Sequence, residues 1–180
     1  MAFPDSIDPK TRLRLTMRRL LRDNIPDSRA ILAALETWLA RHPDLRSIAV
    51  FAALPGEAEL SEFIARHPQR CWLYPRAIND ELSFHRVENP AADLVPGSFG
   101  VREPLAALPR APVQEIDAFL CPGLAFDKRG GRLGRGRGFY DRMLALARPG
   151  AVKTGVCFPF QIVADTFPEA HDVAMDELVF

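Results

Sequence analysis

The most chemically suggestive part of the chain is a segment rich in both glycine and arginine, from Gly130 to Asp141. Five of the 11 glycines lie between positions 130 and 138, and five lysines and arginines lie between 128 and 137. Glycine lets the backbone approach an anion closely and adopt positive φ. Arginine offers forked donors that match the oxygens of a phosphate group. The segment therefore predicts a phosphate-binding loop.

Individual residues of this loop can be given roles. We expect close backbone approach at Gly134, Gly136 and Gly138, and positive charge from Arg132, Arg135 and Arg137. Asp141 is acidic in basic surroundings, and its carboxylate suits a Mg²⁺ ion carried on the phosphates. It could equally be a first-turn helix residue or an ion-pair partner of Arg142. The spacing matches neither a Walker A loop nor G-x-G-x-x-G, so neither of those nucleotide sites is predicted.

A glycine–arginine stretch can also belong to a disordered RNA-binding segment. Here an apolar run precedes it and a helical pattern follows it, which indicates that it is part of the fold. Ligands of open α/β sheets bind beyond the carboxyl ends of strands, where a helix N-terminus offers free N–H groups. A formal net charge of zero implies no general attraction to nucleic acid. We therefore favour phosphate binding over an RNA-binding module.

Short apolar runs supply the strands that would position this loop. They are Ile48–Leu54, Cys71–Tyr74, Ala118–Cys121 and Val152–Phe158. Unbroken apolar runs of this length, separated by helical segments, are typical of parallel strands buried on both faces. Residues 82–87 alternate more and follow Asn79-Asp80, which indicates an edge strand or a hairpin arm.

Helical spacing of apolar residues predicts helices around these strands. The first begins at Asp8-Pro9, because Asp is a favoured N-cap and Pro a favoured first helical residue. Further helices are expected at 28–40, at about 60–66, and from near Gly138 to Leu146. The sequence thus predicts an α/β fold, with a mostly parallel sheet covered by helices on both faces. At 180 residues we expect it to form a single domain, 1–180.

Composition is that of an ordinary globular protein, with 48% hydrophobic and 26% charged residues. The longest apolar run is too short to span a bilayer, and residues 1–10 lack the apolar core of a secretory signal. Cys71, Cys121 and Cys157 lack metal-ligand spacing and are expected to be free in a reducing compartment. We therefore expect a cytoplasmic monomer with neither a membrane nor a nucleic-acid partner.

Several short motifs, spread over nearly the whole chain, carry a resemblance to a known family. The most specific is Pro122-Gly-Leu-Ala-Phe-Asp127, followed by Gly131-Arg-Leu-Gly-Arg-Gly-Arg-Gly-Phe-Tyr-Asp141. The others are Lys10-x-x-x-Arg14, Leu54-Pro-Gly-Glu57, Tyr74-Pro-Arg76, Phe99-Gly-Val-Arg-Glu-Pro104, Gln161 and His171-Asp-Val173. Taken in their order along the chain, these motifs resemble those of the 5-formyltetrahydrofolate cyclo-ligase (methenyltetrahydrofolate synthetase) family.

The resemblance implies a ligase that uses ATP and Mg²⁺ to cyclise 5-formyltetrahydrofolate to 5,10-methenyltetrahydrofolate, releasing ADP and phosphate. In the family's reaction the formyl oxygen attacks the γ-phosphate, N10 of the folate then attacks the activated carbon, and phosphate leaves. An amide oxygen is a poor leaving group until it is phosphorylated, which explains the need for ATP. The protein mainly positions the reactants and neutralises charge.

The resemblance also assigns residues to these ligands. It implies that ATP contacts Lys10, Arg14, Arg132, Leu133, Gly134, Arg135, Gly136, Arg137, Gly138, Phe139 and Tyr140. It implies a folate site made by Glu57, Arg135, Gly136, Arg137, Gly138 and Phe139, and Mg²⁺ ligands Asp141 and Asp172. Arg18 and Arg22 continue the four-residue spacing of Lys10 and Arg14, and we interpret them as a solvated helix face.

Two residues depart from the family's pattern by lacking a hydroxyl. Phe139 stands where Tyr is usual, and Leu60 stands where Thr is common. These changes leave open a catalytically silent relative that binds folate or nucleotide without joining them. His171 adjoins a proposed metal ligand, and we expect it to orient or cap its neighbours rather than act as a general base.

Overall fold

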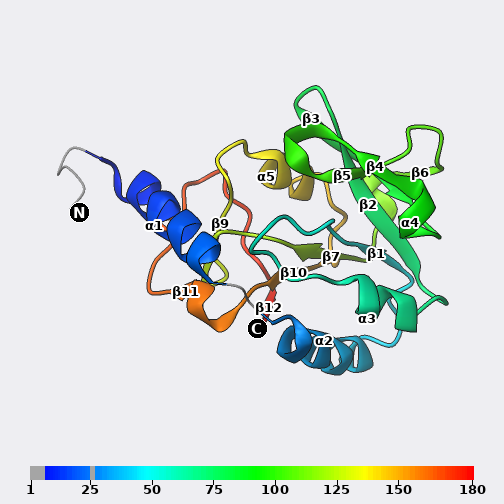
Figure 1. Ribbon diagram of the computed structural model, residues 1–180, viewed down its shortest axis with the longest axis horizontal. Coiled ribbons are helices and arrows are strands. Elements are labelled where there is room, and N and C mark those ends of the chain that lie inside the picture. Colours follow the sequence, from blue (N-terminus) through cyan, green and yellow to red (C-terminus); the bar gives the residue numbers. More distant parts are fainter. Residues whose placement is uncertain (1–6, 25–26) are drawn as a thin grey trace.

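A seven-stranded sheet forms the centre of the fold (Figure 1), in a computed structural model that describes residues 7–24 and 27–180. In spatial order its strands are β12 (Glu177–Val179), β10 (Val152–Val156), β7 (Ala118–Cys121), β1 (Ser47–Ala49), β2 (Cys71–Ile78), β3 (Glu81–Arg86) and β6 (Arg110–Ala111). The first five run parallel, and β3 and β6 are antiparallel additions at one edge. The predicted mostly parallel sheet is confirmed, and residues 82–87 lie largely in the hairpin arm β3.

Apolar side chains cover both faces of this sheet. Ile48 and Trp72 pack on α2 (Arg29–Arg41) and α3 (Ser61–Arg66), whereas Ala49 and Leu73, one residue further along, pack on α5 (Phe139–Leu144). Figure 1 shows α5 on one side of the sheet and α2 with α3 on the other. Successive residues of a strand point to opposite faces, so strands buried on both faces need unbroken apolar runs. The predicted helical cover on both faces is confirmed.

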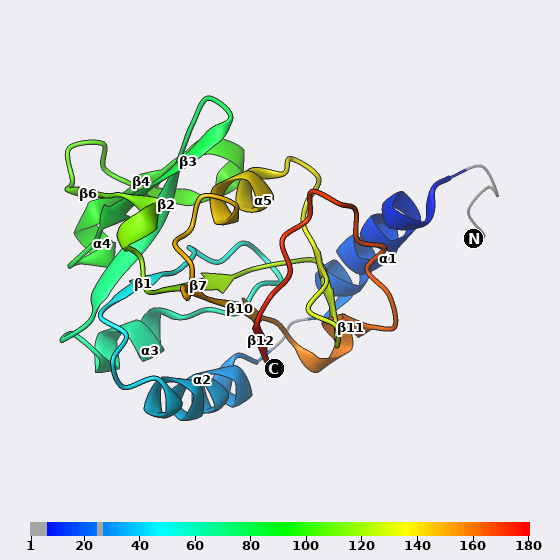
Figure 2. The same cartoon turned by 180° about the vertical axis from the view of Figure 1, so that it is seen from behind.

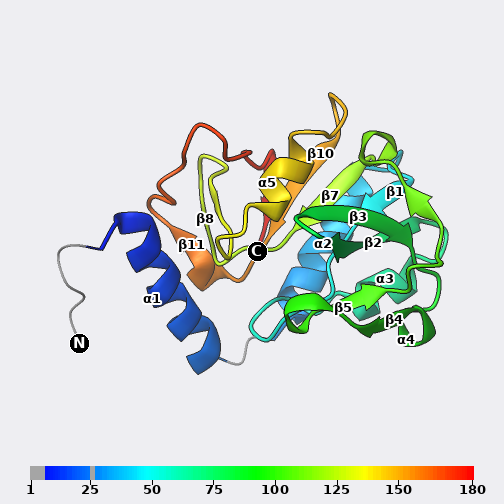
Figure 3. The same cartoon turned by 90° about the horizontal axis from the view of Figure 1, so that it is seen from above.

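A smaller three-stranded sheet, which the sequence did not predict, lies beside the central one. It consists of β8 (Ala125–Asp127), β9 (Arg132–Leu133) and β11 (Ile162–Val163). Helix α1 (Pro9–Asp23) starts at its Asp8 cap, as predicted, and packs Met17 and Leu21 against Leu133 of β9. Figure 3 shows α1 with β8 and β11 at one end of the molecule. This packing brings the first helix to the glycine–arginine segment.

The remaining elements are short and surround the antiparallel edge, as the view from behind shows (Figure 2). They are α4 (Pro90–Asp93) and the two-stranded sheet of β4 (Leu94–Pro96) and β5 (Arg102–Pro104). Single 3₁₀ turns occur at Ser98–Gly100, Val113–Glu115 and Pro159–Gln161.

Several predicted element ends are wrong. Strand β2 continues past Tyr74 to Ile78, and β10 ends at Val156 rather than Phe158. Strand β1 stops at Ala49, because the following residues leave the sheet and turn at Pro55-Gly56. Helix α5 stops at Leu144 and not at Leu146, whose side chain is 59% exposed. The backbone tightens there, with the Leu146 N–H donating to Met143, shortly before Pro149-Gly150.

The expectation of free cysteines is confirmed, with Cys121 and Cys157 buried and Cys71 partly buried. Residues 1–6, on which the expected absence of a secretory signal partly depends, lie outside the described residues. Within the described ranges, no helix is long and apolar enough to cross a membrane.

Asp117 and Asp127 are carboxylates that anchor loops, and their pKa values indicate how the stability of the fold depends on pH. Burial alone would raise the pKa of Asp117 and Asp127, but N–H and O–H donors around each outweigh it and hold each pKa below the ordinary value. Each ionised group therefore stabilises the fold above the unfolded-state pKa of about 4. That contribution is lost as the pH falls through the lower folded-state pKa.

We expect the free energy of unfolding, measured with urea, to fall below about pH 4. The Asp117→Asn variant should be less stable at neutral pH and should lose less stability on acidification. An identical acid response in wild type and variant would contradict the assignment.

Candidate functional site

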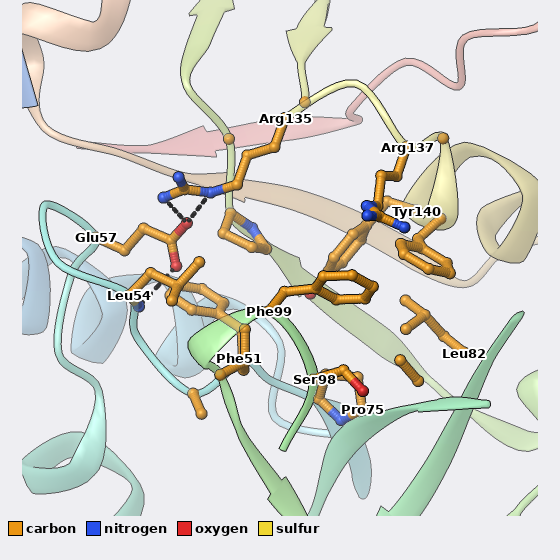
Figure 4. A pocket seen from close by; sticks show the side chains of 18 of the residues that line it. Phe51, Leu54, Glu57, Pro75, Leu82, Ser98, Phe99, Arg135, Arg137 and Tyr140 are labelled. Carbon is orange, nitrogen blue, oxygen red and sulfur yellow. Dashed lines mark hydrogen bonds and ion pairs between the residues drawn. The ribbon is translucent and has the colours of Figure 1, made fainter. Parts of the chain in front are cut away.

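A cavity of about 330 Å³ opens beyond the carboxyl ends of β1 and β7. Its walls are mainly apolar, and we call it the aromatic cavity; Figure 4 shows it from close by. Phe51 and Leu54 follow β1, and Pro122 follows β7. Ala52, Pro75, Ala77, Leu82, Phe99, Val101, Phe139 and Tyr140 complete its apolar lining. The volume is that of a cavity that encloses a small organic molecule.

Glu57 marks one polar end of the aromatic cavity. Its Oε1 accepts from Nε and Nη2 of Arg135, at 3.2 and 2.8 Å, and its Oε2 accepts from the Leu54 N–H at 3.0 Å (Figure 4). The carboxylate side chain is 7% exposed and the arginine 40%. Gly56 adopts φ +87, and a Cβ there would press on Leu21 of α1. The turn and its carboxylate are thus held rigidly against helix and loop.

A cation–aromatic stack forms the other end. The Arg137 guanidinium lies 3.9 Å from the centroid of the Phe99 ring, which is 6.0 Å from that of Phe139. Phe99 has a φ of +59, a conformation that is uncommon for a bulky residue. Glu103, which is buried, accepts from the adjoining Ser98 N–H at 3.1 Å. The 97–100 turn is therefore held with an aromatic ring toward the loop.

A second cavity of about 670 Å³ lies on the other side of the glycine–arginine segment, and we call it the basic cavity. Its cations come from α1 and from the segment itself. They are Lys10, Arg14, Arg132, Arg137 and Arg142. Glu169 to Val173 form the opposite wall. Such a concentration of arginine and lysine favours a polyanionic ligand.

An aspartate and a glutamate of the opposite wall face these cations. Lys10 Nζ donates to Asp172 Oδ2 at 2.5 Å and to Glu169 Oε1 at 3.1 Å. Burial alone would raise the pKa of Asp172, but the donors Lys10 Nζ and Glu169 N–H hold it below its ordinary value. Burial opposes protonation of Lys10, yet its two acidic partners raise its pKa. Lys10 and Asp172 are therefore both charged at neutral pH, and they face each other in the basic cavity.

Arg132 and Asp141 stand between the two cavities and line both. Nη2 of Arg132 donates to Asp141 Oδ1 at 2.9 Å, and the guanidinium lies 5.2 Å from the Tyr140 ring centroid. The arginine side chain is 3% exposed, and its buried Nε has no partner among the described residues. Asp141 Oδ1 also accepts from the Val173 N–H at 3.3 Å, which brings Asp141 close to Asp172.

These residues suit a magnesium–polyphosphate ligand. Among the described residues, no group of three or more metal-binding side chains gathers at one point. Mg²⁺, however, is usually held by one or two carboxylates together with phosphate oxygens. Asp141 and Asp172, beside a set of cations, offer that donor set. The unpartnered Arg132 Nε leaves one donor unused in this wall.

The residues predicted for ATP divide between the two cavities. The basic cavity is lined by Lys10, Arg14, Arg132, Gly134, Gly136, Arg137 and Gly138. Arg135, Phe139 and Tyr140 line only the aromatic cavity, together with the predicted folate residue Glu57. Leu133 lines neither, because its side chain is fully buried against α1. Gly136 and Gly138 have positive φ, as glycine permits, but Gly134 does not.

Three features of the site were not foreseen from the sequence. Arg18 is exposed, as the solvated helix face predicts, but it also lines the aromatic cavity, and its Nη2 donates to the Arg135 carbonyl at 3.0 Å. Arg142 donates to the carbonyls of Arg137 and Asp80 and so fastens the loop to the β2–β3 hairpin. Helix α5 has only six residues, so its dipole is weak, and the positive charge of the site comes mainly from the arginine side chains.

The fold and site define an α/β protein in which a basic cavity and an aromatic cavity share one wall. The model of the 5-formyltetrahydrofolate cyclo-ligase family matches residues 8–180. The chain belongs to the 5-formyltetrahydrofolate cyclo-ligase family.

Relatives of that name cover different shares of the chain. The one from Mycolicibacterium smegmatis is 42% identical over 87 residues, 48% of this chain and 45% of the relative. The one from Mycoplasma pneumoniae is 28% identical over 149 residues, 81% of this chain and 79% of the relative. The chain spans about half the length of several curated relatives it matches, including those from M. smegmatis and Haemophilus influenzae.

Solved structures agree over more of the chain. The NMR structure of Aquifex aeolicus 5,10-methenyltetrahydrofolate synthetase has a TM-score of 0.80 and 28% identity, covering 94% of this chain and 88% of that one. The structure of the 5,10-methenyltetrahydrofolate synthetase from Mycoplasma pneumoniae has a TM-score of 0.78 and covers 96% of this chain and 98% of that one. Its sequence is 24% identical, so this likeness is evidence for the fold alone.

Proposed function

We propose that the protein cyclises 5-formyltetrahydrofolate to 5,10-methenyltetrahydrofolate, using ATP and Mg²⁺ and releasing ADP and phosphate. Membership of the cyclo-ligase family supports the substrate and the reaction. We also propose that it works as a monomer in the cytoplasm, without nucleic acid as a partner. The observation that carries the proposal is the wall shared by the two cavities.

Five residues line both cavities: Arg132, Gly134, Arg137, Gly138 and Asp141. A phosphoryl transfer between two bound molecules requires their reacting atoms to lie within about 3.5 Å. A polyanion in one cavity and an apolar ligand in the other can meet only where the barrier between them is thin. Gly134 and Gly138 add no side-chain bulk to that barrier, which supports direct transfer at those two positions.

In the basic cavity we assign ATP to Lys10, Arg14 and the segment from Arg132 to Gly138. Asp141 and Asp172 would hold Mg²⁺, which would offset the negative charge of the phosphates. In the aromatic cavity, Phe51, Phe99 and Tyr140 offer apolar surface for the folate rings. Glu57 would accept from the amino and ring N–H groups of the pterin in place of, or beside, Arg135.

The proposed reaction makes simple demands on these residues. A bond forms between the formyl oxygen and the γ-phosphorus as the bond to ADP breaks. N10 then bonds to the formyl carbon, phosphate leaves with the former formyl oxygen, and the N10 proton passes to the departing phosphate. Arg132 and Arg137, on the shared wall, neutralise charge on the transferred group. The aromatic walls exclude water, which would otherwise compete with N10 for the activated carbon.

The test is an absorbance assay for the methenyl product, which absorbs in the near ultraviolet. Product should form only when folded protein, ATP, Mg²⁺ and 5-formyltetrahydrofolate are all present, with one ADP released per product. Omitting each component in turn supplies the controls. No product from folded protein under these conditions would refute the proposal.

The alternative, a silent relative, rests on Leu60, which is buried in the core, and on Phe139. Its ring packs near Phe99 and Arg142 and carries no hydroxyl to donate. Binding of both ligands by calorimetry, without ADP release, would favour this alternative.

A further inference from the structure

Asp127 is a buried carboxylate that lines neither cavity, although it belongs to the Pro122–Asp127 motif. It ends strand β8, and the residue is 1% exposed. Its Oδ1 accepts from the N–H groups of Arg129 and Gly131, at 2.9 and 3.1 Å. Its Oδ2 accepts from Thr166 twice, from the N–H at 3.0 Å and from Oγ1 at 2.7 Å. Each oxygen thus holds a different segment of the chain.

The two segments lead into opposite walls of the basic cavity. The 128–131 turn leads directly into Arg132, which pairs with Asp141. Thr166, also 1% exposed, begins the stretch that carries Glu169 and Asp172. Asp127 is therefore bonded to the start of both walls. Its position fixes one relative to the other.

The turn itself has no room to shift. A Cβ on Gly131 would collide with the Asp127 carboxylate and the Thr166 hydroxyl. Gly130 adopts φ +88, and its carbonyl accepts from the Met175 N–H at 2.8 Å. The turn is thus fastened to both ends of the 166–175 segment. The residues that face the cations project between these two fixed points.

We propose that Asp127 is a positioning residue for nucleotide binding. It fixes the 166–175 segment against the glycine–arginine loop and so sets the separation of the acidic wall from the basic one. The proposal rests on the proposed function of the basic cavity. Residues 169–173 line only that cavity, and the loop beyond Arg132 is also held by Arg14 and Arg18. Loss of the Asp127 carboxylate should therefore weaken the binding of ATP more than the binding of folate.

The Asp127→Asn variant tests this. Asparagine has nearly the same shape, but its amide donor cannot accept from the Thr166 groups. We expect the KM for ATP to rise about 10- to 100-fold, as for other residues that orient a ligand's partners, with the KM for folate changed less than about twofold. The matched control is Asp117→Asn: that carboxylate also accepts from two backbone N–H groups, at Arg46 and Ser47, but lies at the amino end of the sheet. Equal changes in both KM values, or the same change in the control, would overturn the proposal.

Amide hydrogen exchange gives a readout that needs no activity. In Asp127→Asn, exchange should accelerate together in residues 128–138 and 166–173, and in neither segment in Asp117→Asn. Thr166→Val, which removes one donor, should show the same acceleration more weakly. Thr166→Ser keeps the hydroxyl donor, and its exchange should be as slow as in the wild type. These two variants decide the matter if Asp127→Asn does not fold. Unchanged exchange in both segments would overturn the proposal. Failure of the wild type to form product would refute the proposed function alone.

Discussion

Replacing Asp141 by asparagine should lower kcat/KM by about 100- to 1,000-fold while leaving the protein folded. Asparagine keeps an oxygen that can accept from Arg132 and from the Val173 N–H, the two donors that Asp141 has now. It lacks the negative charge proposed to hold Mg²⁺ and leaves the Arg132 guanidinium, 3% exposed, without its counter-charge. Because one acceptor survives, we expect a stability loss of about 1–3 kcal/mol.

The measurement is initial rate by absorbance over a range of Mg²⁺ concentrations, with thermal unfolding as the check on folding. Raising Mg²⁺ should recover part of the Asp141→Asn activity if the residue is a ligand. The control is Asp165→Asn, whose carboxylate is 43% exposed and pairs with exposed Arg129 away from both cavities. Wild-type activity in folded Asp141→Asn would remove the metal assignment.

Replacing Glu57 by glutamine should raise the KM for 5-formyltetrahydrofolate about 10- to 100-fold and leave the KM for ATP nearly unchanged. A hydrogen bond to a charged acceptor contributes about 1.5–3 kcal/mol, and about 1.4 kcal/mol is a factor of ten. The two Glu57 oxygens accept from Arg135 and from the Leu54 N–H. Glutamine can satisfy only one of these and must turn its amide donor toward the other.

Glu59→Gln is the matched control for this prediction. Glu59 lies two residues away and accepts from the N–H and Oγ of Ser61, but lines neither cavity. It should keep both KM values. A parallel rise in the KM for ATP in Glu57→Gln would instead indicate that the variant displaces Arg135 and the whole loop. An unchanged KM for folate would exclude Glu57 from the substrate site.

Much of the fold follows from local patterns. Ile48 and Ala49, both apolar, already indicate a strand buried on two faces, and Asp8-Pro9 indicates where the first helix begins. The ends of elements were less predictable. The apolar run after Ala49 continues to Leu54, yet the chain leaves the sheet there, because its apolar residues line a cavity and contact the core outside the ladder.

The sequence by itself determined the family, the central sheet and the loop that can bind phosphate, because residue spacing and glycine conformation are local properties. Only the tertiary structure decided that Arg18 faces a cavity, that Leu133 is core, and that Phe99 stacks on Arg137. It also placed two cavities on either side of Arg132 and Asp141. These relations join segments more than 30 residues apart in the sequence, and their meeting depends on how helices and sheets pack rather than on any local pattern.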